Sequence, residues 1–306
     1  MGYVISIVNM KGGVGKTTIT VNLATCLAKE YRKRVLIVDL DTQVNATISV
    51  IQPLYFTKLR KENRTLRTLI HRQIQPDTSS KLSFQAIVQQ DICRIAGLDL
   101  LPGDIELYND FSLSALIVTK AQKSQQNFTE TWQAFERCLM SEIFQSLKEQ
   151  YDFILLDFPP SNHLLTRSSL IASDYYLIPA KAEPLSVVGI GLLEGCIQKL
   201  KELNPNTESA QLQKDLSQRN ARGNLTLIGI VFTSLGHATN MAEKVKHRLT
   251  EEFGKDKIFK TEIPSNVAVA KAIDDCQPVV INEPQSTGAK GFLDLTSEFL
   301  QKLAAL

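Results

Sequence analysis

The sequence predicts a doubly wound α/β fold in which helices flank both faces of a mainly parallel sheet. Three observations lead to this prediction. Short apolar runs rich in β-branched residues recur along the 306 residues, helical stretches separate most of these runs, and the first run leads through a glycine-rich loop into a helix. The length is within what one such sheet can organise, so we expect a single domain over residues 1–306.

Five apolar runs have the composition of buried parallel strands. Strands that are covered on both faces carry continuous apolar residues rather than an alternating pattern. The runs span residues 3–8, 35–38, 153–156, 175–178 and 227–232. We expect them to lie side by side in one sheet.

Five longer stretches place apolar residues three and four positions apart, which is the spacing of one buried helix face. They span residues 19–31, 130–150, 185–203, 241–253 and 292–303. Two segments interrupt the alternation of strands and helices. Residues 52–148 are long for one crossover and predict an elaboration of the domain, whereas residues 204–224 are polar and predict a loop or short insertion.

Composition and charge exclude several classes of protein. With 43% hydrophobic and 22% charged residues the chain is in the globular range, and 34 basic against 32 acidic residues give a net charge of only +2. Five scattered cysteines without a C-x-x-C pair argue against a disulfide framework and against a structural zinc site. The sequence shows no signal-peptide core and no apolar stretch of membrane-spanning length, so we expect a cytoplasmic protein.

A glycine-rich loop follows the first predicted strand and precedes a predicted helix, which is the context that a P-loop requires. The loop reads Asn-Met-Lys-Gly-Gly-Val-Gly-Lys-Thr-Thr over residues 9–18. Its glycines let successive backbone N–H groups face one anion, and the helix N-terminus adds its positive dipole. We therefore predict a polyphosphate site that includes Gly12, Gly13, Val14 and Gly15.

The residues that end the loop have distinct chemical roles in such a site. Lys16 can reach the β- and γ-phosphates, Thr17 can offer its hydroxyl to Mg²⁺, and Thr18 can contact the α-phosphate. A dinucleotide-binding fingerprint would need glycine where Thr18 stands. The loop therefore favours a nucleotide polyphosphate together with Mg²⁺.

One feature departs from the usual G-x-x-x-x-G-K-T pattern, because Met10 replaces the first glycine and Lys11 follows it. A lysine at the start of the loop points away from Lys16 of the same chain. Its charge is best used on the phosphates of a nucleotide held by a second subunit. The loop therefore predicts a homodimer that holds the nucleotides between its two subunits.

Acidic residues follow two of the predicted strands. Asp157 ends its strand on the side where the P-loop lies, so it can hold a water of the Mg²⁺ shell. Asp39 and Asp41 end the neighbouring strand and, two positions apart, point the same way. Both of these side chains could face the phosphates.

These motifs resemble the ParA/MinD family of deviant Walker A ATPases. The loop over residues 11–18 matches most specifically, while residues 35–43 and 153–160 are similar to the family's first switch and to its Walker B strand with the second switch. Thr42 stands where the first switch usually has proline. Further similar elements follow in the same order at residues 178–183, 193–195, 263–267 and 286–289.

The resemblance implies an ATPase that uses Mg²⁺, hydrolyses ATP slowly by itself and dimerises with ATP. It implies that Asp41 orients the attacking water and that Asp39 lies nearer the metal. On this basis the predicted catalytic residues are Lys11, Lys16 and Asp41, the predicted metal-binding residues are Thr17, Asp39 and Asp157, and further nucleotide contacts are expected from Pro264, Asn266 and Val267.

Missing features narrow the choice of branch within this family. Iron proteins and iron–sulfur scaffold ATPases need cysteine arrangements that this chain lacks, and a tyrosine kinase would carry a tyrosine-rich tail. The MinD branch binds membranes through a basic amphipathic helix, whereas here the charges of the last helix balance. They are Lys290, Asp294, Glu298 and Lys302. We therefore expect this helix to pack on the sheet and provide no stable membrane anchor.

Two groups of basic residues are candidates for DNA contacts without sequence preference. The first comprises Arg60, Arg64 and Arg67, which share one face if their segment is helical. Ser265 and Ala268 replace arginines of a family element, and we expect no helix-turn-helix that reads an operator. The second group lies where ParA-type proteins carry DNA contacts and comprises Lys199, Lys201, Lys214, Arg219, Arg222, Lys244, Lys246 and Arg248.

Together these observations predict a nucleoid-associated ParA-type ATPase that positions or segregates a cargo through a ParB-like or other adaptor. The cargo could be a plasmid, a chromosome origin or a protein body such as a carboxysome. Two alternatives stay open. One is a MinD-like membrane-associated positioning ATPase, and the other is a metabolic enzyme that uses the same loop in an ATP-dependent reaction of a small substrate.

Overall fold

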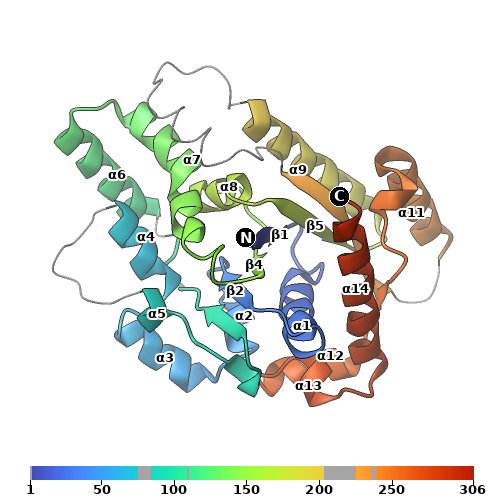
Figure 1. The fold of residues 1–306 in the computed structure, drawn as a ribbon. Coiled ribbons are helices and arrows are strands. Elements are labelled where there is room, and N and C mark those ends of the chain that lie inside the picture. The colour runs from blue at the N-terminus through green and yellow to red at the C-terminus, as the bar shows by residue number, and fades with distance from the viewer. Residues whose placement is uncertain (1, 75–83, 109, 203–224, 236–238) are drawn as a thin grey trace.

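A parallel sheet forms the centre of the computed structural model, which describes residues 2–74, 84–108, 110–202, 225–235 and 239–306. Within these residues seven parallel strands pair in the order β3-β2-β4-β1-β5-β6-β7 (Figure 1). The strands are β1 (Tyr3–Ile7), β2 (Val35–Asp39), β3 (Leu98–Leu101), β4 (Phe153–Asp157), β5 (Tyr175–Ala180), β6 (Thr226–Leu235) and β7 (Ile263–Pro264). The carboxyl ends of β1, β2 and β4 therefore meet at one edge of the sheet.

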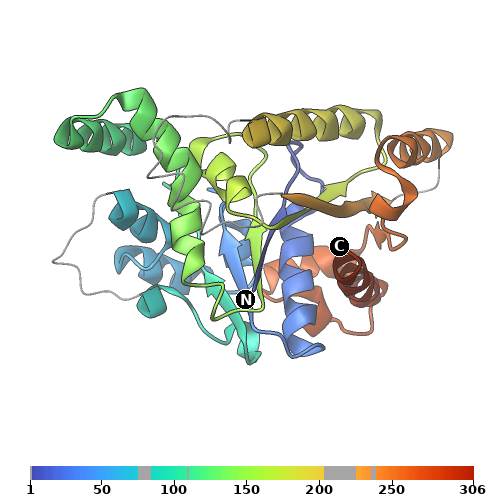
Figure 2. The ribbon, with the colours of Figure 1, turned by 45° about the horizontal axis from the view of Figure 1, so that its top comes forward.

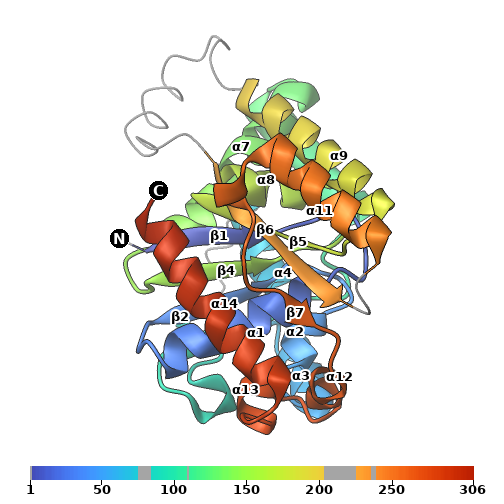
Figure 3. The same ribbon diagram turned by 90° about the vertical axis from the view of Figure 1, so that its right-hand side faces the viewer.

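Helices cover both faces of this sheet. In Figure 3 the sheet separates α7, α8, α9 and α11 from α1, α13 and α14. The helices are α1 (Lys16–Lys29), α2 (Asn45–Ile48), α3 (Pro53–Lys61), α4 (Leu66–Ile74), α5 (Phe84–Ile87), α6 (Asp110–Ser124), α7 (Phe128–Gln145), α8 (Leu164–Ile171), α9 (Pro184–Glu202), α11 (Asn240–Phe253), α12 (Val267–Asp274), α13 (Val279–Asn282) and α14 (Thr287–Ala304). The predicted doubly wound α/β architecture is confirmed.

Each central strand contributes to two cores, one on each face of the sheet. On β1, Val4 packs into the core that includes residues of α7, α8 and α9, while Ile5 and Ile7 pack into the core that includes residues of α1 and α14. The three side chains are completely buried. Because successive residues of a strand point to opposite faces, a strand covered on both sides is mostly apolar. The polar residue of β1, Ser6, is buried and its hydroxyl shares a 2.7 Å hydrogen bond with that of Ser173. The requirement for apolar residues explains why the sequence signal for these strands is strong.

All five predicted strands are present, and every predicted helix overlaps an observed one. Two strands were not predicted, because β3 has four residues interrupted by Asp99 and β7 has only two residues. β3 lies within the segment 52–148 and pairs with β2, so this part of the segment belongs to the sheet. The other described residues of the segment are mostly helical, and its α6–α7 hairpin extends past the sheet (Figure 2).

Two expectations about organisation are not tested by this fold. The polar segment 204–224 lies outside the described residues, and the single-domain interpretation stays a prediction.

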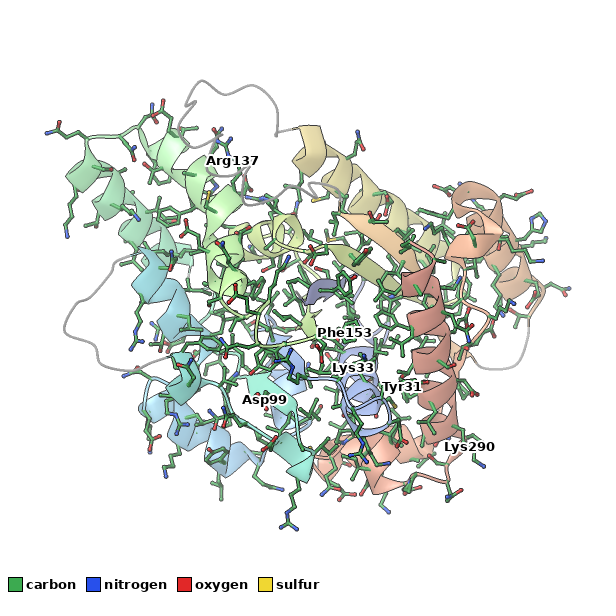
Figure 4. All side chains as sticks on the ribbon, in the orientation of Figure 1. Tyr31, Lys33, Asp99, Arg137, Phe153 and Lys290 are labelled. Carbon is green, nitrogen blue, oxygen red and sulfur yellow. The ribbon has the colours of Figure 1, made fainter. Side chains whose placement is uncertain are left out.

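The C-terminal helix packs on the sheet as predicted. Its fully buried side chains include Phe292, Leu295 and Phe299. Lys290 lies on the exposed side of α14 (Figure 4), and Glu298 accepts hydrogen bonds from backbone N–H groups of residues 260 and 261. Across the described part of the chain, no helix is both long enough and apolar enough to span a bilayer.

Candidate nucleotide site

The glycine-rich loop connects the end of β1 to the start of α1, as the sequence predicts. Gly13 and Gly15 adopt φ angles of 68° and 83°, which residues with a Cβ atom rarely adopt. A Cβ atom on Gly12 or Gly13 would have no heavy atom within 4 Å, so the loop presents its backbone openly at these positions. Since α1 is fourteen residues long and begins at Lys16, its N-terminal dipole points at the same place. This geometry suits a bound polyphosphate.

Two buried side chains that the sequence analysis did not single out hold the loop against the sheet. The amide of Asn9 donates to the carbonyl oxygen of Pro179 at 2.8 Å and accepts from the backbone N–H of Lys11 at 2.9 Å. The hydroxyl of Thr233 on β6 donates to the carbonyl oxygen of Val14 at 2.8 Å. The available sequence signal for Asn9 was a polar residue directly after the apolar run at residues 3–8. Nothing in the sequence pointed to Thr233.

Lys16 lies at the centre of the site with its side chain almost fully buried. Its Nζ atom donates to the carbonyl oxygen of Lys11 at 2.9 Å. Burial lowers the pKa of the Lys16 ammonium group, while the negative charges of Asp157 and Asp41 act in the opposite direction. A lysine held between carboxylates in this way is placed to bind an anion that enters the loop.

Asp157 lies at the end of β4 and receives hydrogen bonds from α1. The hydroxyl of Thr17 donates to its Oδ2 atom at 2.7 Å, and the hydroxyl of Thr20 donates to its Oδ1 atom at 3.3 Å. Burial raises the pKa of this carboxyl group well above the ordinary value, and neighbouring Asp39 raises it further. The structure thus brings together Thr17 and Asp157, the two predicted metal-binding residues that can share one Mg²⁺.

Thr20 was missed by the sequence analysis, although its spacing was informative. It lies three positions after Thr17 on the same helix, so the two hydroxyl groups share one face of α1. Both face the same carboxylate.

Asp39 is also fully buried, directly opposite Asp157 in the register of β2 and β4. Its Oδ1 atom accepts from the backbone N–H of Asp41 at 3.0 Å, and its Oδ2 atom accepts from the N–H and the hydroxyl of Thr47 at 2.8 and 2.7 Å. Burial raises its pKa to about 6. Both carboxylate oxygens of Asp39 thus accept hydrogen bonds from the loop after β2. The metal-binding role of Asp39 stays a prediction.

Asp41 follows β2 in the same buried region of the site. Its side chain is nearly buried, and its Oδ1 atom accepts from the backbone N–H of Gln43 at 2.9 Å. Its negative charge acts on the Lys16 ammonium group. The structure therefore brings Asp41 close enough for its charge to act on the loop lysine, and its water-orienting role stays a prediction.

Lys11 directs its side chain away from Lys16, as predicted. Its Nζ atom forms an ion pair with the carboxylate of Glu183, whose side chain is half exposed. This contact lowers the pKa of the Glu183 carboxyl group. Because Lys16 contacts the carbonyl oxygen of Lys11 while the ammonium of Lys11 reaches the surface, the two lysines serve different sides of the loop.

The segment after β7 follows the sheet edge next to the P-loop. β7 pairs with β6 at Thr233, the residue that holds Val14, so Pro264 lies one strand away from the loop. Asn266 caps α12 through a 2.7 Å bond from the N–H of residue 268, and Val267 is 83% exposed. The nucleotide contacts expected from Pro264, Asn266 and Val267 stay a prediction.

The first group of basic residues differs from the expected single helical face. α3 ends at Lys61 and α4 begins at Leu66, because Asn63 adopts a left-handed conformation with φ of 54°. The arginines are paired with acidic groups: Arg60 with Asp104 and Glu106, Arg64 with Glu62, and Arg67 with Glu106. These pairs weaken this group as a site for phosphates.

The second basic group is only partly within the described residues. Lys199 on α9 is exposed, and so are Lys244 and Arg248, which lie four positions apart on neighbouring α11. Lys246 pairs instead with Glu243 and Glu262. Outside the described residues are Lys214, Arg219 and Arg222, and the side chain of Lys201 is likewise not described.

Comparisons with known proteins agree with this site. A family model described as an AAA domain matches residues 2–209. The sporulation initiation inhibitor protein Soj from Bacillus subtilis is 30% identical over 298 residues, covering 97% of this chain and 98% of Soj. The chromosome partitioning protein ParA from Myxococcus xanthus is 27% identical over 310 residues, covering 99% and 89% of the two chains.

Solved structures show the same fold at lower identity. A Cyanothece McdA variant in complex with ATP is 18% identical with a TM-score of 0.70, covering 98% of this chain and 96% of McdA. Cobyrinic acid a,c-diamide synthase from Mycobacterium smegmatis with bound ADP and magnesium is 20% identical with a TM-score of 0.67, covering 100% and 96%. On the family match and the Soj relationship, the chain belongs to the ParA/MinD family of P-loop ATPases.

Proposed function

We propose that this chain is a Mg²⁺-dependent ATPase that dimerises with ATP, binds nucleoid DNA without sequence preference and positions a cargo through an adaptor that stimulates hydrolysis. The observation that carries the catalytic part is the cluster of Lys16, Asp41 and Asp157 around an open glycine loop. A buried cation for phosphate and carboxylates for metal and water are the parts that phosphoryl transfer requires.

The residues at the carboxyl end of β4 fit a magnesium ion. Thr17 and Asp157 offer a hydroxyl and a carboxylate oxygen within 2.7 Å of each other, and oxygen donors of this kind suit Mg²⁺. The ion would neutralise charge on the phosphates of ATP. Asp41 does not belong to this pair. We propose that it orients the attacking water instead.

Two features beside the loop support a dimer. Lys11 carries its ammonium group to the surface, and helix α9 begins directly after its partner Glu183. On α9, large apolar side chains spaced by three and four positions are 68%, 58% and 65% exposed: Leu185, Val188 and Leu192. A Cβ on Gly189 of this helix would lie 3.8 Å from Cβ of Lys11, so the apolar stripe adjoins the lysine. Exposed apolar surface of this kind is typical of an interface.

The DNA-binding part rests on the exposed residues of the second basic group. Lys199, Lys244 and Arg248 occupy neighbouring helices α9 and α11, which lie side by side in Figures 1 and 3. Two copies in a dimer would present this group twice, and each added phosphate contact strengthens binding at low salt.

A metabolic P-loop enzyme is the rival from another class, since the diamide synthase shares this fold. With Mg²⁺ present, the rate of phosphate release from ATP should rise when DNA and the adaptor are added together. The product of the neighbouring gene is the first candidate for this adaptor. A rate that depends on a small carboxylate substrate instead would favour the metabolic enzyme. For the MinD-like alternative, ATP-dependent sedimentation with anionic liposomes is the decisive observation.

Lys16→Ala and Asp41→Ala should separate binding from hydrolysis. Lys16→Ala removes the buried cation at the loop, so it should abolish nucleotide binding in a titration with a fluorescent ATP analogue. Asp41→Ala should bind ATP normally, accumulate as a dimer and lose roughly 100-fold or more in hydrolysis rate, because only the water is mispositioned. Hydrolysis by Asp41→Ala at the wild-type rate would move this role to another residue.

Lys11→Ala should bind ATP through Lys16 and Thr17 yet fail to dimerise. DNA affinity should fall with it, and the slope of log affinity against log salt should become shallower by about 0.9 for each DNA phosphate that the protein no longer neutralises. The measurements are a salt titration of DNA binding and the mass in solution, both with ATP. The matched control is Lys29→Ala at the other end of α1, which should resemble wild type. A Lys11→Ala protein with normal mass and salt slope would make Lys11 an ordinary surface lysine.

Arg248→Ala should weaken DNA binding at low salt, because it removes an exposed guanidinium from the second basic group. Arg67→Ala removes the same group from a side chain that is paired with Glu106, so it should leave the salt slope nearly unchanged. Both proteins should hydrolyse ATP at wild-type rates without DNA. The reverse order of effects would place the DNA contacts on α3 and α4.

A further inference from the structure

A chain of buried hydrogen bonds links the loop that carries Asp41 to the end of β3. Asp39 lies at its centre and accepts bonds from the N–H of Asp41 and from both donors of Thr47. The hydroxyl of Thr47 accepts in turn from the N–H of Gly103 at 3.0 Å. Asp39 and Thr47 are completely buried, so these bonds are shielded from competing water.

The position of Gly103 shows how tightly this contact is built. A Cβ atom there would lie 3.0 Å from both the carboxyl carbon and the carbonyl oxygen of Asp39. The next residue, Asp104, accepts a bond from the hydroxyl of Thr65 at 2.9 Å, and the N–H of Leu66 donates to the carbonyl oxygen of Pro102 at 2.8 Å. The loop after β3 is therefore fixed from both sides.

The loop between Asp41 and Thr47 contains a residue in an unfavourable backbone conformation. Val44 adopts φ of 50° and ψ of 31°, and its β-branched side chain makes the left-handed region costly. Such a conformation persists only where surrounding contacts over-determine it. Here the N–H of Val44 donates to the carbonyl oxygen of Asp41 at 2.9 Å, and Thr47 closes the loop onto Asp39.

We propose that Thr47 is a positioning residue that holds Asp41 against the nucleotide loop by fixing the carboxylate of Asp39. The hydroxyl of Thr47 donates to Asp39 and accepts from Gly103, so this one group connects the loop that carries Asp41 to the end of β3. The inference rests on the proposed ATPase function, since Asp41 needs a defined place only if it orients water. The hydroxyl of Thr47 bonds to Asp39 and Gly103 rather than to the glycine loop, so we expect its loss to leave nucleotide binding intact.

Thr47→Val tests this inference, because valine keeps the shape of threonine and removes the hydroxyl. Its kcat for ATP hydrolysis should fall roughly 10- to 100-fold, the range expected for a misplaced reacting group. The KM for ATP and the dissociation constant of a nonhydrolysable analogue should stay within about twofold of wild type, because the contact matters only for the transition state. Thr47→Ser restores a hydroxyl and should recover most of kcat.

Thr296→Val is the matched control, because Thr296 is equally buried and its hydroxyl donates to the carbonyl oxygen of Phe292 within α14. It should leave kcat unchanged. Gly103→Ala disturbs Asp39 from the other side while keeping the Thr47 hydroxyl, so it should also lower kcat without weakening nucleotide binding. It provides the test if Thr47→Val fails to fold.

Three results would count against the inference. Full kcat in Thr47→Val would overturn it, and so would equal losses of nucleotide affinity and kcat, which would indicate general damage to the site. Failure of serine to restore kcat would show that the hydroxyl is not what matters. A wild-type chain that hydrolyses no ATP would overturn the proposed function itself, and this inference with it.

Discussion

Two buried carboxylates at the ends of neighbouring strands determine how the rest of the site is arranged. Asp39 and Asp157 lie in register on β2 and β4, burial raises the pKa of both carboxyl groups, and the charge of Asp39 raises the pKa of Asp157 further. The fold offsets this repulsion with hydroxyl groups from α1 and α2, with backbone N–H groups and with the ammonium group of Lys16. The glycine loop and the acidic strand ends are therefore parts of one electrostatic unit, and the proposed Mg²⁺ would complete it.

Most of the central fold could be predicted because its strands are covered on both faces. An interior strand such as β1 is mostly apolar on both faces, and this leaves a clear run in the sequence even though Ser6 interrupts it. The edge strand β3 has no such requirement along its whole length, since its Asp99 accepts a bond from the hydroxyl of Tyr151. β7 is too short to carry any pattern. The two missed strands are thus the shortest of the seven described strands, whereas β3 is as buried as the predicted ones.

The candidate site shows the same division between local and distant contacts. The positions of the loop residues up to Thr18 and of the acids that end β2 and β4 could be predicted from their order along the chain, while their roles stay a prediction. Thr233 and Gly103 could not be predicted, because each meets its partner only after the sheet has formed. The arginines of the first basic group were overestimated for a related reason. The acidic partners of Arg60 and Arg67, which are Asp104 and Glu106, lie about forty positions away in the chain, where no local pattern reveals the pairing.

The ion pair between Lys11 and Glu183 bears on how two subunits would first meet. A half-exposed pair of this kind contributes only about 0–1 kcal/mol, so the lysine can exchange one anion for another at little cost. While Glu183 neutralises it, the surface around the loop carries no surplus positive charge from Lys11, and two copies can approach without mutual repulsion at that point. On assembly, the ammonium group of Lys11 would exchange its contact with Glu183 for a contact with phosphates bound by the partner subunit. In the single chain, the carboxylate of Glu183 thus occupies the place that we propose for the partner's phosphates.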